Sequence, residues 1–447
     1  MPLDLTMRFV DRLADKVASS ISFSEVTDAS SVVDTKVERV GLNVRVPFCA
    51  LKCAYCAVPG DRYSLEAAQM FLRSVDRELE LYAESLGRPK VDRVYVSGGT
   101  PSLMHREIGT LVDMVGERFG SRGKVAIEAS PTDLSPDVVR NLRDAGVDQI
   151  SVGVQTFDEG MLASLNRAMK REKLEKSLRT VMDAGFDYVN IDLMFSLRGQ
   201  TTSSILDDLK TAGELGVHGI SVYPLMLLPY TPMTMDMMSG KSGGWVQDPR
   251  AEKDQYLAIV SFLRDHGYKL RTLWSFSQRP EEYEGPYEHS NFVGIGPRAW
   301  GMVNNKFTLN CSGVVEYESK LEKGVLPLHA YSEVKGYSIA KFARCLYNGK
   351  LSGQEIKALS AEDRKVTGYI WALRLLRLME KTGDGVALTD RAMSYGSHAT
   401  KKIAMATLTR MDEASGAGAR GHGGGEKKEQ RPLRIDGLDL QEREPTV

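Results

Sequence analysis

Three cysteines within eight residues are the side chains in this sequence best suited to chemistry. They are Cys49, Cys53 and Cys56, in the pattern C-x-x-x-C-x-x-C. Three thiolates on one loop can hold three irons of a cubane iron–sulfur cluster, which leaves the fourth iron without a protein ligand. An open iron can chelate a small molecule and pass it an electron, so this spacing favours a cluster that takes part in a reaction over one that only transfers electrons.

Two plainer interpretations of the three cysteines stay open. Structural zinc usually takes four ligands, so a fourth would have to come from Cys311, Cys345 or a distant histidine. The cysteines could also be buried free thiols. The seven histidines show no metal-ligand spacing, and only His289 stands in an aromatic, polar stretch near the expected site. We expect Cys311 and Cys345 to be buried thiols.

A glycine turn and several polar residues stand where predicted strands end. Gly98 and Gly99, followed by Thr100, let the backbone approach a ligand closely. Polar residues at the ends of successive parallel strands point into one mouth and could together hold a ribose, an amino group and a carboxylate. Each of them alone could equally be a cap or a loop residue. They are Glu128, Gln155, Arg167 and Asp192.

The elements that would position these residues alternate regularly. Six short β-branched runs are each followed by a stretch of helical length with charged faces, which predicts an α/β fold with a parallel sheet and helices outside. Such a sheet stays open or curls into a barrel, and in both cases the site lies beyond the carboxyl ends of the strands. The runs are Leu42–Val46, Val91–Ser97, Lys124–Ser130, Gln149–Gln155, Tyr188–Phe195 and Gly219–Leu225.

The remaining segments flank this core. Apolar residues at helical spacing predict a helix over 4–19. The Met-rich piece from Met233 to Met238 is an adaptable apolar wall, a surface loop or core filler. The last segment has too few apolar residues to order itself. The predicted organisation is a leader over 1–40, the β/α core over 41–270, a covering segment over 271–330, a helical domain over 331–410 and a disordered tail over 411–447.

Composition limits the class of protein. The 447 residues are 42% hydrophobic, and 58 Lys and Arg balance 59 Asp and Glu to a net charge of −1. These values are typical of a soluble globular protein and argue against a nucleic-acid binder with a broad basic field. No apolar run approaches the roughly 18 residues of a membrane span, and the first residues lack a signal-peptide layout. Five cysteines do not form a secreted disulfide framework, so we expect a reducing, cytoplasmic location.

Several segments of the sequence resemble the motifs of a known enzyme family. The segment Cys49–Cys56, with Tyr55 before its last cysteine, resembles the signature of radical S-adenosylmethionine (SAM) enzymes. Val46–Cys49 resembles the branch of oxygen-independent coproporphyrinogen III oxidases and their heme-chaperone relatives. The likeness spans roughly 41–390, and its helical part resembles the C-terminal domain of that branch. It continues through Val96–Leu103, Ser151–Phe157, Asp192–Phe195 and Gly294–Gly296.

The resemblance implies a partial (β/α)6 barrel and two cofactors. The three cysteines would bind a [4Fe-4S] cluster, and SAM would chelate its open iron. The turn at Gly98, Gly99 and Thr100 would hold the methionine amino group. Reductive cleavage of SAM would give a 5′-deoxyadenosyl radical, with a flavodoxin- or ferredoxin-type protein as reductant. The residues that would line one or two SAM sites are Tyr55, Glu128, Gln155, Arg167 and Asp192.

At several positions this sequence differs from the motifs of that branch, and these differences favour one activity. The oxidases tend to carry an aromatic residue and a histidine where this chain has Asn43 and Arg45, and a further cysteine where it has Val58. The chaperone motif His-Asn-x-x-Tyr-Trp is replaced by His289–Phe292, and Gly-x-Pro-Gly by Ser196–Gly199. These differences favour a methyltransferase or cyclopropanase that uses a second SAM to alkylate a bulky aromatic or tetrapyrrole-sized substrate. The alternatives are a coproporphyrinogen III oxidase and a non-enzymatic heme chaperone.

Overall fold

The computed structural model describes residues 5–414, except 20, 34, 59, 230, 242, 281–290, 305, 334–341 and 343–344. His289 therefore lies outside the described residues, as does most of the predicted tail. The last described helix runs to Ala414, past the predicted start of the tail at residue 411.

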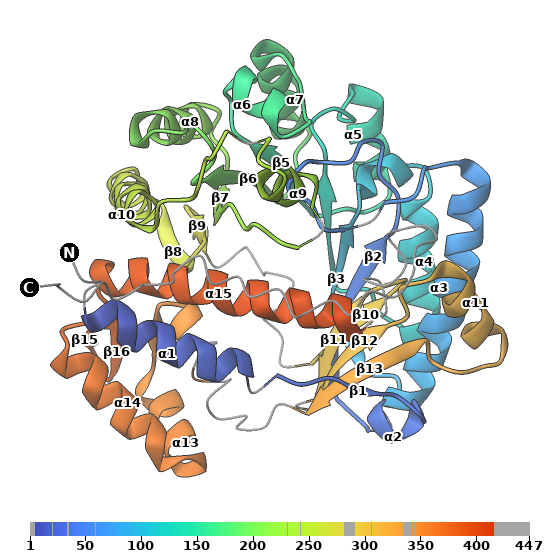
Figure 1. The fold of residues 1–447 in the computed structure, drawn as a ribbon. Helices are drawn as coiled ribbons and strands as arrows, with labels where there is room; N and C mark the ends of the chain where they lie inside the picture. Colours follow the sequence, from blue (N-terminus) through green and yellow to red (C-terminus); the bar gives the residue numbers. More distant parts are fainter. Residues whose placement is uncertain are drawn as a thin grey trace, which may run out of the picture.

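Six neighbouring parallel strands form the core of the molecule, as predicted. β2 and β7 do not pair with each other in the described part of the chain, because β10 and β9 occupy their outer edges, so the barrel is partial and open (Figure 1). Buried β-branched residues such as Val44, Val152 and Ile191 explain why these runs become strands that are covered on both faces. The six strands are β2 (Arg39–Val46), β3 (Lys90–Gly98), β4 (Lys124–Ala129), β5 (Gln149–Gln155), β6 (Tyr188–Phe195) and β7 (Gly219–Pro224).

Helices cover the outside of this sheet. In the first of them, capping residues determine where the helix begins and ends. Ser64 caps its N-terminus by accepting a hydrogen bond from the Ala67 amide, and Gly87, with φ 76°, caps its C-terminus. The helices are α3 (Leu65–Leu86), α4 (Ile108–Phe119), α5 (Pro136–Asp144), α6 (Glu159–Ser164), α7 (Arg171–Asp183), α8 (Thr202–Glu214) and α10 (Pro249–Asp265), with a 3-10 turn η1 (Pro101–Met104). A further helix, α9 (Pro232–Met238), lies against the cysteine loop instead, where the Met233 amide donates to the Ala54 carbonyl oxygen at 2.9 Å.

The predicted covering segment extends both edges of the sheet. β10 runs parallel to β2, and β11, β12, β13 and β1 follow it in antiparallel order; β9 and β8 extend the other edge. At Gly294 an added Cβ would lie 2.4 Å from the Trp300 carbonyl oxygen, so this glycine permits close strand packing and opens no dinucleotide-binding helix. The elements are β1 (Ser24–Glu25), β8 (Lys269–Thr272), β9 (Ser275–Ser277), β10 (Phe292–Ile295), β11 (Trp300–Val303), β12 (Lys306–Asn310), α11 (Val314–Glu322) and β13 (Leu328–Glu333).

The C-terminal part is helical, as predicted, but it also holds a small sheet that the sequence did not reveal. Its strands have two to four residues, too few to show an alternating pattern. In α14 the apolar residues Val366, Ile370 and Leu373, at helical spacing, are buried, whereas Leu376 caps the end of the helix and is 39% exposed. The elements are β14 (Lys350–Leu351), α13 (Gly353–Glu362), α14 (Arg364–Leu375), β15 (Met379–Thr382), β16 (Gly385–Leu388) and α15 (Asp390–Ala414).

The predicted leader helix is α1 (Leu5–Ser19), and it lies alongside α15 (Figure 1). Lys402 forms ion pairs with Asp11 and Asp15, and a buried ion pair of 2.6 Å joins Lys401 to Glu252 on α10. A short helix, α2 (Ser30–Val33), follows in the leader. These contacts hold α15 between the leader and the barrel, and the helix crosses in front of the open sheet.

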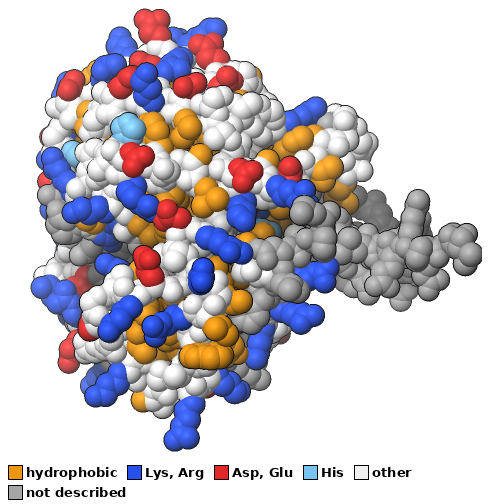
Figure 2. Space-filling view, turned by 90° about the vertical axis from the view of Figure 1, so that its left-hand side faces the viewer, with side chains coloured by type: hydrophobic (Ala, Val, Ile, Leu, Met, Phe, Trp, Pro, Cys, Tyr) orange, Lys and Arg blue, Asp and Glu red, His pale blue; other side chains and the backbone are white. Residues whose placement is uncertain are grey.

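Both signs of charge occur on the face that lies to the left in Figure 1, with small hydrophobic patches between them (Figure 2). This mixture agrees with the balanced composition. None of the helices in the described part of the chain has the length and apolar character needed to span a membrane.

Candidate active site at the mouth of the barrel

The cysteine loop leaves the carboxyl end of β2 and is fixed at its base. The amide of Cys49 donates to the carbonyl oxygen of Asp61 at 2.9 Å, and Phe48 and Asp61 form a parallel bridge. Cys49, Cys53 and Cys56 are all free and half-buried. Burial raises the pKa of the Cys49 and Cys56 thiols, so metal binding would release their protons.

Two glycines let the backbone pass close to the first thiol. A Cβ added to Gly99 would lie 2.2 Å from the Phe48 carbonyl oxygen and 3.0 Å from the Cys49 Sγ. One added to Gly60 would lie 2.6 Å from the same Sγ. Gly98 has φ +108°, which disfavours other residues. The structure therefore brings the predicted turn at Gly98–Thr100 directly against the cysteine loop.

The four predicted polar residues share one cavity with the cysteines and the glycine turn. The cavity has a volume of about 310 Å³, and Tyr55 also lines it. Glu128 accepts a hydrogen bond from the Tyr95 hydroxyl at 3.1 Å, and Asp192 accepts from Ser151 at 3.2 Å. Burial raises the pKa of Glu128, and burial together with the nearby Glu128 raises the pKa of Asp192 to about 7.

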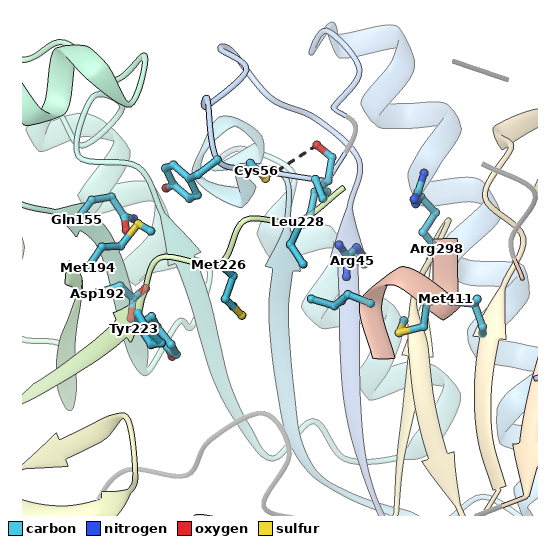
Figure 3. A pocket seen from close by; sticks show the side chains of 16 residues that line it. Arg45, Cys56, Gln155, Asp192, Met194, Tyr223, Met226, Leu228, Arg298 and Met411 are labelled. Carbon is cyan, nitrogen blue, oxygen red and sulfur yellow. Dashed lines mark hydrogen bonds between the residues drawn. The ribbon is translucent and has the colours of Figure 1, made fainter. Parts of the chain in front are cut away.

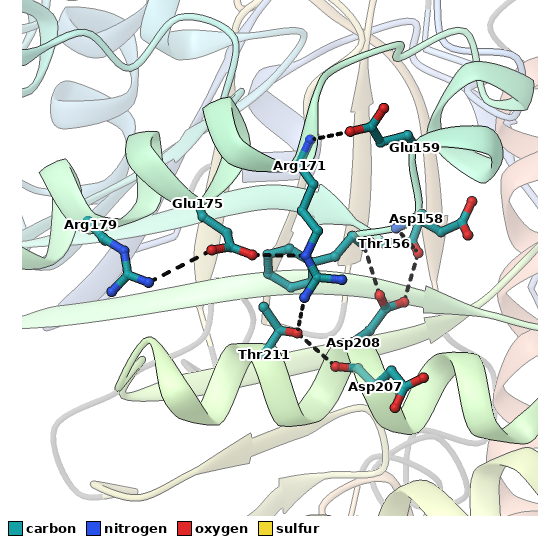
Figure 4. A network of polar contacts seen from close by, with 10 residues as sticks. Thr156, Asp158, Glu159, Arg171, Glu175, Arg179, Asp207, Asp208 and Thr211 are labelled. Atoms are coloured by element: carbon teal, nitrogen blue, oxygen red, sulfur yellow. Dashed lines mark hydrogen bonds and ion pairs between the residues drawn. The ribbon is translucent and has the colours of Figure 1, made fainter.

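Gln155 reaches this cavity from an unusual backbone conformation, with φ +72°. The residues after it are fixed to α8, because the buried Asp208 carboxylate accepts from the Thr156 hydroxyl and the Phe157 amide, both at 2.8 Å (Figure 4). Burial raises the pKa of Asp208 to about 6. Arg171 lies over the Phe157 ring and adds a second restraint. This polar network therefore holds Gln155 in place.

A second cavity, of about 320 Å³, continues from the polar one. Both cavities are lined by Tyr55, Cys56, Gln155 and Asp192, but the rest of the second wall is mainly apolar. In Figure 3 Gln155, Asp192, Met194 and Tyr223 lie on one side, and Arg45, Arg298 and Met411 on the other. The residues found only in this apolar cavity are Arg45, Ala57, Met194, Pro224, Met226, Leu228, Arg298, Leu309, Leu408 and Met411.

Some sequence expectations about this region need correction. The Met-rich α9 does not line the apolar cavity, and its Met235 and Met238 are exposed, so the surface interpretation is right for these residues. Met194, Met226 and Met411 line the wall instead. No local pattern could have revealed Leu408 or Met411, because they come from a helix far along the chain.

The other two cysteines lie apart from the site. Cys311 is fully buried and donates to Glu316 at 3.3 Å, whereas Cys345 is only half-buried. Neither belongs to the described lining of the polar cavity, so neither adds a fourth ligand there. The donor set that remains is three thiols on one loop beside a polar cavity, which fits a cluster with one open iron.

Comparisons with known proteins agree with this geometry. Residues 43–212 match the family model of the radical SAM superfamily. The heme chaperone HemW of Mycobacterium tuberculosis is 27% identical over 364 residues, covering 78% of this chain and 91% of its own length. The oxygen-independent coproporphyrinogen III oxidase of Bradyrhizobium diazoefficiens is 30% identical over 272 residues, covering 58% of this chain and 59% of its own length.

A solved structure shares the fold. The coproporphyrinogen III oxidase HemN of Escherichia coli, described as a radical SAM enzyme, matches with a TM-score of 0.69 and 20% identity, covering 85% of this chain and 92% of that one. Radical SAM proteins use a [4Fe-4S] cluster and SAM. The chain therefore carries a radical SAM domain over residues 43–212, and it is similar in sequence to heme chaperones and oxygen-independent coproporphyrinogen III oxidases and in fold to one such oxidase.

Proposed function

We propose that this protein is a radical SAM enzyme that oxidatively decarboxylates a tetrapyrrole of the coproporphyrinogen III type. The observation that carries the proposal is the continuity of the two cavities, one polar and lined by the three cysteines, the other apolar with two arginines in its wall. Coproporphyrinogen III has a large apolar body and carboxylate side chains, so it matches an apolar cavity with cationic groups. Related oxidases in sequence and fold support this choice.

In this proposal the chain's own residues divide the work. Cys49, Cys53 and Cys56 hold the cluster, and the Gly98–Thr100 backbone with Arg167 orients SAM through its polar groups. With both cofactors bound, their chemistry is the one-electron reductive cleavage of SAM, which allows hydrogen removal from an unactivated C–H bond. A flavodoxin- or ferredoxin-type protein would deliver the electron.

The residues that line both cavities separate the SAM site from the substrate site. Tyr55, Gln155 and Asp192 line both cavities, so a substrate in the apolar cavity contacts the same side chains that surround SAM. The partly buried Tyr55 packs against an apolar cluster of Leu165, Met194, Leu197 and Leu225, which limits water near this wall. These residues would orient the reacting carbon and keep solvent away from it.

The test is anaerobic turnover of the cluster-loaded protein with coproporphyrinogen III, SAM and a reductant. We expect loss of carbon dioxide, the divinyl product, and one methionine with one 5′-deoxyadenosine for each carboxylate removed. The Cys53→Ala variant should form none of these. SAM cleavage that is indifferent to this substrate, with no product formed, would overturn the proposal.

A second candidate is a heme chaperone. The chaperone relative from Mycobacterium tuberculosis is matched over 91% of its length, more than the 59% of the Bradyrhizobium oxidase. Heme also combines an apolar ring with carboxylates, so the same cavity would suit it. Stoichiometric heme binding without conversion of coproporphyrinogen III would favour this candidate.

The comparisons do not favour the alkylating reaction that the sequence departures suggested. The named relatives are heme chaperones and coproporphyrinogen oxidases, so decarboxylation and chaperone activity are better supported. Turnover with SAM deuterated at its methyl group separates the activities. Decarboxylation predicts no label in the product, whereas methyl or methylene transfer requires it.

A further inference from the structure

We infer that Arg45 and Arg298 form a carboxylate-binding site in the apolar cavity and select substrates that carry free acid groups. This inference rests on the proposed function and deepens it, because it names the side chains that distinguish an acidic tetrapyrrole from a neutral one. The two arginines come from distant parts of the chain, one at the end of β2 and one after β10. Both line the apolar cavity and neither lines the polar one.

The surroundings of the two guanidinium groups favour a strong contact with an acid. The side chains around them on this wall include the apolar Leu309, Leu408 and Met411. A charge-assisted hydrogen bond is stronger where water is excluded, and a guanidinium can bind a carboxylate through two parallel bonds. An acid placed here gains more than it would at an open surface.

The backbone at Arg298 supports a role for its side chain. Arg298 has φ +58°, in the left-handed region where a residue other than glycine is disfavoured. Its amide donates to the Cys311 carbonyl oxygen at 2.9 Å, which fixes the turn whatever the side chain is. Glycine would adopt this turn with less strain, so in the proposed site the contact between the arginine side chain and the acid offsets that cost.

Two glycines leave room for Arg45. A Cβ added to Gly98 would lie 2.7 Å from the Arg45 Cγ, and one added to Gly296 would lie 2.6 Å from the Arg45 carbonyl oxygen. The side chain therefore passes over Gly98 toward the mouth. Its charge also acts on the buried Glu128 and on Cys56, which places it beside the polar cavity.

The arrangement implies an orientation for the substrate. Arg298 lies across the apolar cavity from Gln155 and Asp192 (Figure 3). An acid group held at Arg298 leaves the opposite end of the molecule against the wall shared with SAM. Met194, Met226 and Met411 can adjust to a ring between these ends, because methionine side chains are flexible.

The experiment measures binding and does not depend on turnover. Coproporphyrin III and its tetramethyl ester are titrated by fluorescence into the full-length protein, the Arg298→Gly and Arg45→Gln variants, and a control variant, Arg140→Gln. Arg140 is an exposed residue of α5 that pairs with Asp137, far from the cavity lining. Thermal unfolding is recorded for every variant.

We expect the unaltered protein and Arg140→Gln to bind the acid at least about tenfold more tightly than the ester. Arg298→Gly and Arg45→Gln should lose most of this preference with little change in ester affinity, since a charged hydrogen bond is worth a factor of this order. Arg298→Gly should unfold at the same or a higher temperature, because glycine suits φ +58°. If Arg298 had only a structural role, the Arg298→Gly variant would unfold at a lower temperature instead.

The binding results distinguish a failure of the arginine site from a failure of the proposed function. Tight binding of acid and ester alike, or equal loss of both in the variants, would overturn the arginine site and leave the tetrapyrrole substrate standing. Binding of neither compound by the unaltered protein would overturn both.

Discussion

The guanidinium Nη1 of Arg167 lies 3.3 Å from the Sγ of Cys53, although 114 residues separate them along the chain. The same side chain donates to the Gly153 carbonyl oxygen at 2.8 Å, so it joins the cysteine loop to the end of β5. The neighbouring Asn166 donates to the Lys52 carbonyl oxygen at 2.7 Å. The turn after α6 thus holds the cysteine loop against the sheet and places a cation in the polar cavity.

Replacing Arg167 with glutamine should weaken SAM binding about tenfold or more, because a charge-assisted contact to the SAM carboxylate is lost. Arg167→Lys should keep part of the affinity. Arg179→Gln, on the exposed face of α7, is the control. The check is equilibrium binding of SAM to cluster-loaded protein, and equal affinity for all four proteins would contradict a SAM-binding role.

Gly99→Ala should prevent normal cluster loading, since the new methyl group would collide with the Phe48 carbonyl and crowd the Cys49 thiol. Gly116→Ala is the matched control, because a Cβ there meets no atom within 4 Å. Iron and sulfide analysis after reconstitution measures the effect. Full loading of Gly99→Ala would show that the turn tolerates a side chain and would count against its close approach to the cluster.

SAM affinity should rise with pH between 6 and 8. Burial and the nearby Glu128 raise the pKa of Asp192 to about 7, so its carboxyl loses its proton across this range. The ionised form accepts hydrogen bonds from ligand hydroxyl groups more strongly than the neutral acid does. Asp192→Asn should flatten the profile, and an unchanged pH dependence in this variant would assign the effect to another group.

Glu78 should make the protein less stable as pH rises. It is fully buried and accepts hydrogen bonds from the Tyr317 hydroxyl at 2.5 Å, the Gly296 amide at 2.8 Å and the Asn310 amide nitrogen at 2.7 Å. Burial outweighs these contacts and raises its pKa to about 8, from 4.5 as a free group.

The direction of this pH dependence follows from the linkage between proton binding and folding. Between pH 4.5 and about 8 the folded protein holds a proton on Glu78 that the unfolded chain releases, so stability falls with rising pH in this window. Glu78→Gln removes this contribution, and its unfolding temperature should depend less on pH from 5 to 8. Parallel curves for the two proteins would show that Glu78 is ionised in the folded state.

The parallel core was predictable because it follows from local pattern. Strands buried on both faces need continuous β-branched runs, and Val152 and Ile191 stand in such runs. The strand ends then bring Glu128, Gln155 and Asp192 to one mouth, which the structure confirms by placing them in one cavity. Their roles with SAM remain a proposal.

The apolar cavity was not predictable. The place of Arg298 in the cavity could not be predicted, because its conformation depends on a turn that is fixed by a hydrogen bond to the Cys311 carbonyl oxygen. Leu408 and Met411 reach the cavity only because α1 and α10 hold α15 across the open sheet. The small sheet β14–β16 was missed because its strands are shorter than the window in which alternation can be seen.

The central claim is that three cysteines of one loop bind a cluster that cleaves SAM. The most direct measurement is iron content and SAM cleavage of the anaerobically reconstituted protein, compared with Cys53→Ser and with Cys311→Ser, whose thiol is buried elsewhere. We predict about four irons and reductant-dependent 5′-deoxyadenosine for the unaltered protein and Cys311→Ser, and neither for Cys53→Ser. A protein free of iron after reconstitution, or SAM cleavage that survives loss of Cys53, would contradict the account.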